Sequence, residues 1–143
     1  MIVRKMTPED ISAAMALDAL SFNKPWSEQF FSDELGKDYG YYTVAELDGE
    51  IVGYGGVWCI YETAELIRIA VNPKMRRTGI ADTIMQSLFA YSKDCGCEKM
   101  MLEVRSSNTP AIGLYRKHRF NEISIRRAYY DGEDAVIMEA KIV

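Results

Sequence analysis

The segment that most constrains the fold of this chain runs from Ile67 to Ala81. It has the pattern of a strand, then a turn closed by Pro73, then a basic turn that contains Gly79 and opens a long helix. The first backbone N–H groups of a helix have no partners within the helix, so they attract an anion. Gly79 permits an unusual backbone conformation and the close approach of a ligand. The segment therefore predicts an α/β unit with a phosphate or pyrophosphate site.

The charges around this turn favour the same ligand. Lys74, Arg76 and Arg77 add positive charge where the helix begins. The pattern Arg76-x-x-Gly79-x-Ala81 arises by chance in roughly one chain in ten of this size, so an ordinary basic turn remains the alternative. The choice between the two depends on the rest of the chain.

Hydrophobic periodicity and turn residues place further elements on both sides of this segment. Before it we expect a strand at Ile2–Arg4, a helix begun by Thr7 with Ile11, Met15, Leu17 and Leu20 on its apolar face, a helix capped by Ser27, and a hairpin of Tyr42–Leu47 with Ile51–Ile60 around Asp48-Gly49. After it we expect a helix at Gly79–Lys93, a strand at Lys99–Val104, a helix from Thr109 to Lys117, and strands at Phe120–Arg126 and Ala135–Ala140 joined through Tyr129–Asp134. The order predicts one α/β domain over residues 1–143 with a mixed sheet. Glycines in the second hairpin strand predict a bulge or the close approach of another backbone.

Length and charge limit the class of protein. A chain of 143 residues suits one hydrophobic core. The net charge of −4 and the pI of about 5.1 argue against a protein that coats nucleic acid and permit a basic peptide as partner. The N-terminus has no secretory signal pattern, and the longest apolar run, Ile51–Tyr61, is too short to span a bilayer. We therefore expect a cytoplasmic protein that binds neither membrane nor nucleic acid directly.

Cysteine and histidine usage excludes two kinds of chemistry. The three cysteines, Cys59, Cys95 and Cys97, predict reduced thiols rather than a disulfide framework. Cys95-x-Cys97 lacks the spacing and the histidine of a metal site, so we expect no metal. His118 is the only histidine and lies at a helix end, where a cation favours the dipole, so a Ser-His-Asp or Cys-His mechanism is not expected.

The element order and the basic turn together resemble the GCN5-related N-acetyltransferase (GNAT) superfamily. Arg76, Gly79 and Ala81 match its phosphate-binding pattern [Q/R]-x-x-G-x-[G/A]. The resemblance covers nearly the whole chain. It implies the GNAT fold, a twisted and mostly antiparallel mixed sheet that is splayed in the middle and flanked by about four helices, with acetyl-coenzyme A as co-substrate.

Further motifs resemble the RimI-type alanine N-acetyltransferases within that superfamily. The matching stretches are Pro25–Glu28, Ala64–Val71, Leu102–Asn108, Ala111–Tyr115 and Arg127–Ala135. Enzymes of this type acetylate the N-terminus of ribosomal protein bS18. The resemblance therefore implies a peptide partner, the bS18 N-terminus, for a protein that is a monomer or a weak dimer.

The resemblance also implies a role for particular positions. The pantetheine arm would pair with the backbone of Ile69, Ala70 and Val71, and the N–H of Val71 could stabilise the oxyanion. The pyrophosphate would be held by Arg76, Arg77, Thr78, Gly79, Ile80, Ala81 and Asp82. Asn108 would bond to the pantetheine, cap its helix, or do both. The peptide groove would be lined by Trp26, Tyr129, Tyr130 and Glu133.

Glu103 and Tyr115 are the predicted general base and general acid. A free α-amine has a pKa near 8 and is about a tenth neutral at pH 7, so a carboxylate acting through water suffices as its base. Alternation in the strand puts Glu103 on the face opposite Leu102 and Val104. The alternative for Glu103 is a solvated carboxylate or a partner of Arg105. The alternative for Tyr115 is a core tyrosine with a wet hydroxyl.

Some features leave the acceptor open. A GNAT enzyme acting on a small amine or on protein lysines remains possible, as does a non-catalytic coenzyme-binding regulator. Acidic residues near the N-terminus favour an arginine-rich peptide: Glu28, Asp33, Glu34 and Asp38. Asp82 would repel a phosphate, so we expect its side chain to point away. Arg119 occupies a helix-ending position that favours glycine, at a cost of roughly 1 kcal/mol.

Overall fold

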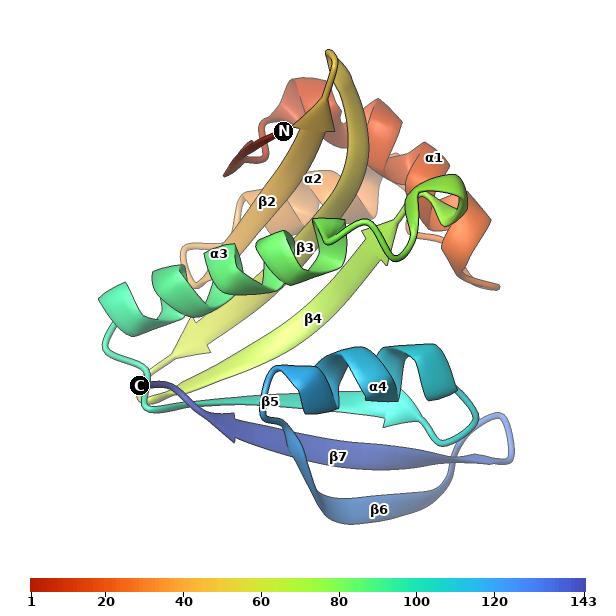
Figure 1. Ribbon diagram of the computed structural model, residues 1–143, viewed down its shortest axis with the longest axis vertical. Coiled ribbons are helices and arrows are strands. Elements are labelled where there is room, and N and C mark those ends of the chain that lie inside the picture. The colour runs from red at the N-terminus through yellow and green to blue at the C-terminus, as the bar shows by residue number, and fades with distance from the viewer.

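The computed structural model describes residues 1–143, which build one seven-stranded sheet in the order β1-β2-β3-β4-β5-β7-β6 (Figure 1). The elements are β1 (Ile2–Lys5), α1 (Ile11–Ser21), α2 (Glu28–Leu35), β2 (Gly40–Leu47), β3 (Glu50–Ile60), β4 (Thr63–Val71), α3 (Ile80–Asp94), β5 (Lys99–Arg105), α4 (Thr109–Lys117), β6 (Asn121–Tyr130) and β7 (Glu133–Lys141), with 3-10 turns at Pro8–Asp10 and Pro73–Met75. Only β4 and β5 pair in parallel; every other pair is antiparallel. None of the helices is long and apolar enough to cross a membrane.

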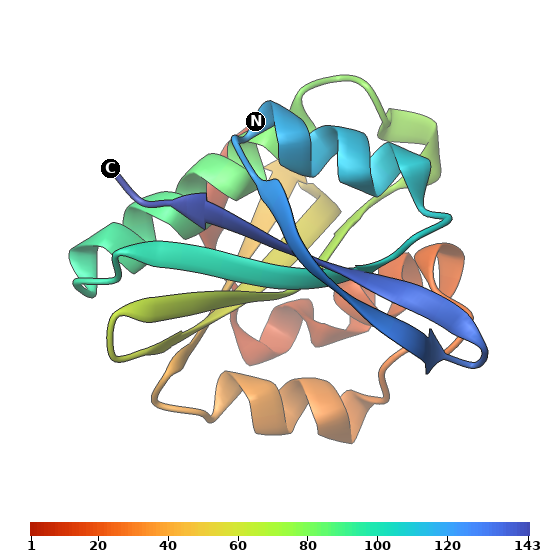
Figure 2. The same ribbon diagram turned by 90° about the horizontal axis from the view of Figure 1, so that it is seen from below.

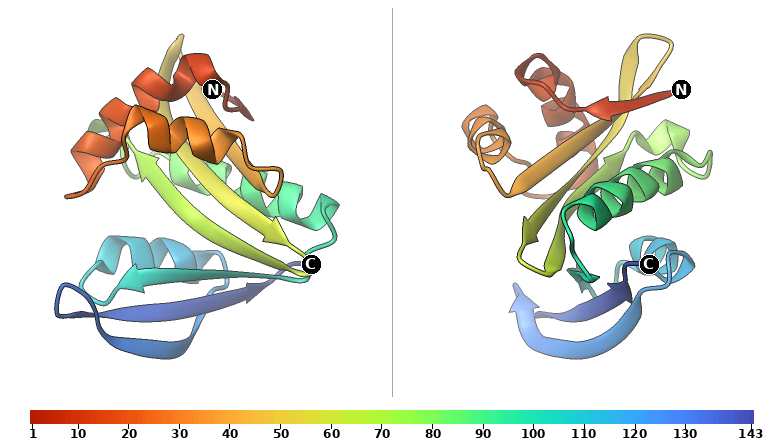
Figure 3. Two further views of the ribbon diagram at one scale, coloured as in Figure 1. Left: turned by 180° about the vertical axis from the view of Figure 1, so that it is seen from behind. Right: turned by 90° about the vertical axis from the view of Figure 1, so that its left-hand side faces the viewer.

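The helices cover the two faces of the sheet unequally. Helices α1 and α2 lie on one face of β2–β4, and α3 lies on the other (Figure 3). Helix α4 lies on the α3 side, over β5 and β7 (Figure 1). Buried residues such as Ile84, Leu88 and Phe120 fill the α3 side, whereas Phe31 and Tyr54 belong to the cluster under α1 and α2. The outer face of β5 and β7 has no helix over it (Figure 2).

Local signals set the elements of the first half as expected. Asp48 and Gly49 have positive φ angles of 51° and 82°, the conformation of a two-residue hairpin turn between β2 and β3. The hydroxyl of Ser27 caps α2 by accepting a hydrogen bond from the N–H of Phe30 at 3.1 Å. The hairpin and the helix start predicted from these residues are confirmed.

The glycines of β3 are required by their neighbours. A Cβ atom at Gly56 would lie 2.0 Å from the ring of Tyr42, and one at Gly55 would lie 2.7 Å from Ile84. The pairing of β3 with β4 also shifts register between Gly56 and Val57. The bulge expected from these glycines is therefore confirmed, whereas the groups that approach Gly55 and Gly56 most closely are side chains rather than another backbone.

Strands β4 and β5 form a fork. They pair only where Thr63–Glu65 meets Lys99–Met101, and beyond these residues the strands diverge (Figure 1). Each strand keeps its other neighbour, since β4 pairs with β3 and β5 pairs with β7 over nearly their whole lengths. The splayed sheet implied by the resemblance is confirmed, and we call the point of divergence the fork.

Two expectations were wrong. Tyr129 and Tyr130 belong to β6 and Glu133 begins β7, so the connection between the strands is a tight turn at Asp131-Gly132 rather than a six-residue segment. The strands continue because a bulge between Arg126 and Tyr130 restores their pairing. Leu20, expected on the apolar face of α1, is 63% exposed.

Candidate active site

The basic turn after β4 has the backbone expected of an anion site. Arg77 and Gly79 adopt left-handed conformations, with φ angles of 63° and 85°. A Cβ atom at Gly79 would meet nothing within 4 Å, so the start of α3 faces open space. The side chains of Arg76, Arg77 and Thr78 are exposed beside it. The predicted unusual conformation of Gly79 is confirmed, and the turn suits a pyrophosphate because free backbone N–H groups lie beside two exposed arginines.

The other residues of this turn divide into backbone and side-chain roles. Ile80 is 3% exposed and packs into the core, so only its N–H group can serve a ligand. Ala81 is half-buried and too small to obstruct the helix start. Asp82 points away from the turn, as expected, because its carboxylate binds Lys117 Nζ at 2.7 Å and His118 Nε2 at 2.8 Å. The hydrogen bond from Lys117 is the largest cause of the lowered pKa of Asp82.

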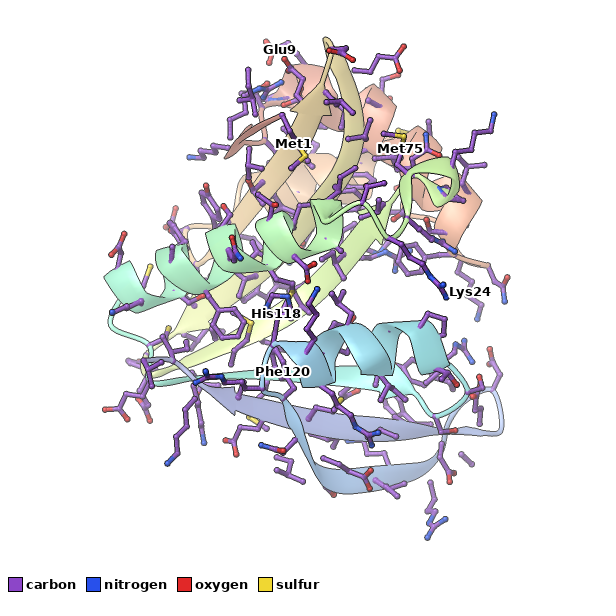
Figure 4. The ribbon with its side chains drawn as sticks, in the orientation of Figure 1. Met1, Glu9, Lys24, Met75, His118 and Phe120 are labelled. Atoms are coloured by element: carbon purple, nitrogen blue, oxygen red, sulfur yellow. The ribbon has the colours of Figure 1, made fainter.

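The bond between Asp82 and His118 joins two helices that flank the fork. Figure 4 shows His118 between the start of α3 and the end of α4. His118 follows the last residue of α4, which agrees with the predicted role at a helix end. The sequence did not reveal its carboxylate partner, which lies 36 residues earlier.

A bulge in β4 changes which way its last residues face. Leu66 pairs with Val57 and Arg68 pairs with Gly56, so Ile67 has no partner. Beyond the bulge, Ile69 and Val71 pack with the α3 side, whereas Ala70 joins the cluster under α1 and α2. Their backbone pairs with β3 on one edge only, because β5 has diverged. The free edge of Ile69, Ala70 and Val71 can therefore bind an extended ligand in the fork.

Glu103 lies just beyond the fork, on the face of β5 without helices. Its neighbours Leu102 and Val104 are 2% and 5% exposed and turn to the opposite face, which confirms the predicted alternation. Oε1 of Glu103 lies 3.4 Å from Nη1 of Arg126. Arg105, the expected alternative partner, binds Glu133 instead. The Glu103 carboxylate is thus paired only with Arg126, and 27% of its side chain is exposed.

Tyr115 lies on the other face of the fork. Its ring is 8% exposed and packs edge-to-face on Phe120, with 5.8 Å between ring centroids. Its hydroxyl makes no hydrogen bond within the chain, so the proton is free to be donated. Burial raises the pKa of this phenol above its usual value, because the phenolate would lose water.

Asn108 caps α4. Its Oδ1 accepts a hydrogen bond from the N–H of Ala111 at 3.3 Å, so the capping role is confirmed. The amide nitrogen of Asn108 has no partner in the chain and remains available to a ligand at the start of α4. The two predicted roles of Asn108 are therefore compatible.

The expected peptide-binding residues come from two separate segments. Trp26 lies between α1 and α2, in residues 22–27, which we call the α1–α2 segment. Tyr129 and Tyr130 lie at the β6–β7 turn with 5.1 Å between ring centroids, and Tyr129 is 52% exposed. The two segments meet where Lys24 Nζ lies 3.7 Å from Asp131 Oδ2. The structure therefore brings these residues to the same side of the fork.

Glu133 has a use within the chain. Its Oε2 accepts a hydrogen bond from the N–H of Ser107 at 2.8 Å, and its Oε1 lies 3.4 Å from Arg105. The hydrogen bonds from Ser107 are the main cause of its lowered pKa. Glu133 therefore fixes the loop that leads into α4, whatever contact it makes with a peptide.

Sequence reasoning gave no role to Glu65, which shares a hollow with Glu103. The hollow has a volume of about 240 Å³ and is lined by Thr63, Glu65, Met101, Leu102, Glu103, Arg126 and Ile137. Burial and the charge of Glu103 raise the pKa of Glu65. The only sequence signal was its place in Ala64–Val71, one of the stretches that resemble the RimI-type enzymes.

A forked sheet with an anion-binding turn on one side and a carboxylate and a phenol on opposite faces defines an enzyme of the acyltransferase class. The acetyltransferase (GNAT) family model matches residues 11–120. The chain belongs to this family of acetyltransferases, whose donor is acetyl-coenzyme A.

Relatives of known activity match nearly the whole chain. The ribosomal protein bS18-alanine N-acetyltransferase of Escherichia coli K12 is 33% identical over 144 residues, which cover 98% of this chain and 97% of that protein. An N-alpha-acetyltransferase of Saccharolobus solfataricus is 35% identical over 151 residues, covering 95% and 90%. The crystal structure of the ribosomal-protein-S18-alanine N-acetyltransferase from Escherichia coli superposes with a TM-score of 0.90 at 31% identity, covering 99% of this chain and 93% of that one.

Proposed function

We propose that this protein transfers the acetyl group of acetyl-coenzyme A to the α-amine of the N-terminal alanine of ribosomal protein bS18. The placement of Glu103 and Tyr115 on opposite faces of one fork carries the proposal, because a donor in the fork would lie between a base and an acid. The bS18-modifying relative from Escherichia coli supports the choice of acceptor. The protein would act in the cytoplasm, as a monomer or a weak dimer.

The donor would be bound mainly by backbone groups, with a few side chains added. The N–H groups at the start of α3 and the guanidinium groups of Arg76 and Arg77 would bind the pyrophosphate. The free edge of β4 from Ile69 to Val71 would pair with the pantetheine arm, with the amide of Asn108 near it. The coenzyme supplies an activated thioester. The N–H of Val71 would donate a hydrogen bond to the carbonyl oxygen as negative charge develops there.

The acceptor side needs only a modest base. The α-ammonium of a peptide loses its proton near pH 8, whereas a lysine side chain does so near 10.4, a difference of about 3 kcal/mol at equal pH. A carboxylate such as Glu103, acting directly or through one water molecule, can remove the proton of the α-ammonium. Arg126 would balance the negative charge of the Glu103 carboxylate before that carboxylate takes up the proton.

Tyr115 would protonate the departing sulfur. Burial raises the pKa of Tyr115, so its phenol is a weaker acid here than it would be in water. The same burial raises the proton affinity of a thiolate formed beside it, because both anions lose water. The two shifts oppose each other, so proton transfer from Tyr115 remains close to balanced. A hydrogen bond from the Tyr115 hydroxyl in the transition state would also stabilise the developing charge.

The acceptor peptide would run between the α1–α2 segment and the β6–β7 turn, past Trp26, Tyr129 and Tyr130. Among the acidic residues expected to attract a basic peptide, Glu34 is excluded because it is 1% exposed and binds Tyr42 and Trp58. Glu28 and Asp38 remain exposed and add negative charge on the α2 side.

A comparison of three acceptors, each tested separately, tests this function. The protein is incubated with acetyl-coenzyme A and one of three acceptors: a peptide that begins Ala-Arg, the same peptide with a blocked N-terminus and an internal lysine, or spermidine. We expect acetylation of the free N-terminus to exceed the other two by at least about a hundredfold in kcat/KM, in line with the difference in amine deprotonation. Transfer only to lysine or spermidine would refute the N-terminal assignment, and transfer to none would favour a coenzyme-binding regulator.

A further inference from the structure

We propose that Arg68, together with Asp18, is a positioning residue that holds the α1–α2 segment as one wall of the acceptor site. The proposal rests on the function proposed above, because it concerns the same acceptor. It adds a residue from the donor-binding strand whose side chain faces the acceptor side and controls the position of Trp26.

Asp18 is the buried centre of the arrangement. It is completely buried in α1, and such a carboxylate is stable only when its oxygens are paired. Arg68 donates to it from Nε at 3.1 Å and from Nη2 at 2.9 Å. The N–H of Trp26 donates to Oδ2 at 2.6 Å, and the hydroxyl of Tyr54 donates to Oδ1. Asp18 thus ties β4, β3 and the α1–α2 segment to one point.

Arg68 itself grips the segment at several atoms. Its guanidinium lies 3.6 Å from the ring centroid of Phe22 and 4.6 Å from that of Trp26. Its Nη2 also donates to the carbonyl oxygen of Lys24 at 3.2 Å. A planar guanidinium can stack on aromatic rings and bind a carboxylate at the same time, which a lysine cannot do. One side chain therefore fixes Phe22, Lys24 and Trp26 together.

The bulge in β4 explains how the side chain reaches this face. Because Ile67 is unpaired, Arg68 turns toward α1, and the next residue, Ile69, packs on the α3 side. The donor is proposed to pair with Ile69–Val71 of β4, and Arg68, the residue directly before this stretch, holds the acceptor wall. A shift of the wall would change where a peptide amine meets the fork without changing the donor edge.

A second contact shows that the wall borders an opening. Lys24 lies on the side of the molecule where β4 and β5 are far apart (Figure 4). Its Nζ is 3.7 Å from Asp131 at the β6–β7 turn, but both side chains are more than 70% exposed, so this ion pair is weak. The position of the wall is accordingly set by Arg68, which contacts it from β4, rather than by the ion pair between Lys24 and Asp131.

The test replaces the ion pair without leaving a lone buried charge. In the double variant Arg68→Met with Asp18→Asn, the new asparagine still accepts the hydrogen bond from Trp26, and methionine keeps most of the volume. We expect the KM for an Ala-Arg peptide to rise about tenfold, with kcat and the KM for acetyl-coenzyme A changed less than about threefold. The single variant Arg68→Lys keeps the charge but loses the stacking, and it should raise the peptide KM by a smaller factor.

A second ion pair with a buried aspartate, near the N-terminus, offers a matched control. Arg4 binds Asp10 with the same two-pronged geometry, at 2.8 and 2.9 Å, between β1 and the turn before α1. The double variant Arg4→Met with Asp10→Asn should lower stability to a similar degree and leave the peptide KM unchanged. A rise in the peptide KM in both variants would mean that general loosening is responsible, and the proposal would be wrong.

A readout independent of activity follows Trp26 directly. The chain has two tryptophans, so a Trp58→Phe background makes Trp26 the only indole emitter. In that background the Arg68 and Asp18 double variant should shift the emission of Trp26 and speed hydrogen exchange at its amide, whereas the Arg4 and Asp10 double variant should do neither. Unchanged emission and exchange would overturn the holding role. A peptide KM that stays constant while Trp26 moves would overturn the role in acceptor binding.

Failure of the proposal can be told from failure of the function. If the wild-type protein acetylates no peptide N-terminus, the proposed function is wrong and the acceptor role of Arg68 falls with it. If the wild-type protein is active and the Arg68 variants keep its peptide KM, only the role of Arg68 is wrong.

Discussion

Arg126 on β6 reaches across β7 to place its guanidinium 3.4 Å from the carboxylate of Glu103 on β5. On β7, Ile137 pairs with Glu103 and Ala135 pairs with Arg126, so the guanidinium crosses β7 diagonally by two residues. Directly opposed residues share a face of the sheet, so the small side chain of Ala135 leaves room for the long one to cross. The proposed base on β5 therefore has a counter-charge from β6, a strand with which β5 does not pair.

Replacing Glu103 tests the base. We expect Glu103→Gln to lower kcat/KM for an Ala-Arg peptide by at least about tenfold at pH 7, because the amide cannot accept the proton of the α-ammonium. Steady-state kinetics measure the effect. Glu139→Gln is the control, since Glu139 on β7 pairs with Lys99 on β5 and should tolerate the change. An unchanged rate in Glu103→Gln would exclude this residue as the base.

The phenol of Tyr115 can be removed with little structural cost. Because its hydroxyl makes no hydrogen bond within the chain, Tyr115→Phe should keep the unfolding midpoint while kcat falls by at least about tenfold. Urea unfolding and single-turnover kinetics check the two quantities. Equal activity of the phenylalanine variant would show that another group protonates the sulfur.

A side chain at Gly79 should block the pyrophosphate. Gly79→Asp adds a negative charge at the start of α3 and should weaken acetyl-coenzyme A binding by at least about tenfold, as measured by calorimetry. Gly96→Asp is the matched control, because Gly96 also has a positive φ, 87°, and open space around its Cβ position, but lies at the far end of α3. Equal affinity of the two variants would place the coenzyme elsewhere.

Arg119 carries backbone strain that glycine would relieve. Its φ is 68°, in the left-handed region, which confirms the conformation expected where α4 ends. We expect Arg119→Gly to raise the free energy of unfolding by about 1 kcal/mol, measured by urea denaturation. A loss of stability would mean that the Arg119 side chain makes a compensating contact.

The stability contributed by Asp10 should depend on pH. The hydrogen bonds from Arg4 lower the pKa of Asp10 in the folded protein below its value in the unfolded chain, near 3.9. A lowered pKa stabilises the fold above the unfolded value, and this gain is lost as pH falls through the folded value. Asp10→Asn should thus be less stable than wild type at pH 7, with the gap closing below about pH 4. Urea denaturation of both proteins between about pH 2 and pH 7 measures this gap, and a gap that stays constant over that range would contradict the prediction.

Features set by a few neighbouring residues were predictable from the sequence. The Asp48-Gly49 turn, the cap at Ser27 and the conformation of Gly79 each depend on local backbone preferences, and all three match. The alternation that places Glu103 opposite Leu102 and Val104 also follows from strand geometry alone.

Features that depend on which elements face each other were not predictable. The ion pair of Asp18 with Arg68 joins residues 50 positions apart, and the bond of Asp82 to His118 spans 36. The bulge at Ile67 leaves no mark in the hydrophobic pattern, yet it decides that Arg68 faces α1. Leu20 was misplaced because the buried face of α1 ends with the charged Asp18, which pairs with Arg68, rather than with the apolar residue two positions later.

The short pairing between β4 and β5 also bears on how the molecule holds together. Strands β1–β4 form one unit of the sheet and β5–β7 a second, with only three residues of each strand in the backbone seam, although one hydrophobic core spans both units. Backbone hydrogen bonds therefore contribute little to holding the two units together, and packing across the shared core contributes most. A ligand in the fork touches both units, so its binding energy adds to their cohesion by mass action. The donor would therefore serve as a temporary part of the protein's own framework, and the fold would be tightest while the reaction is in progress.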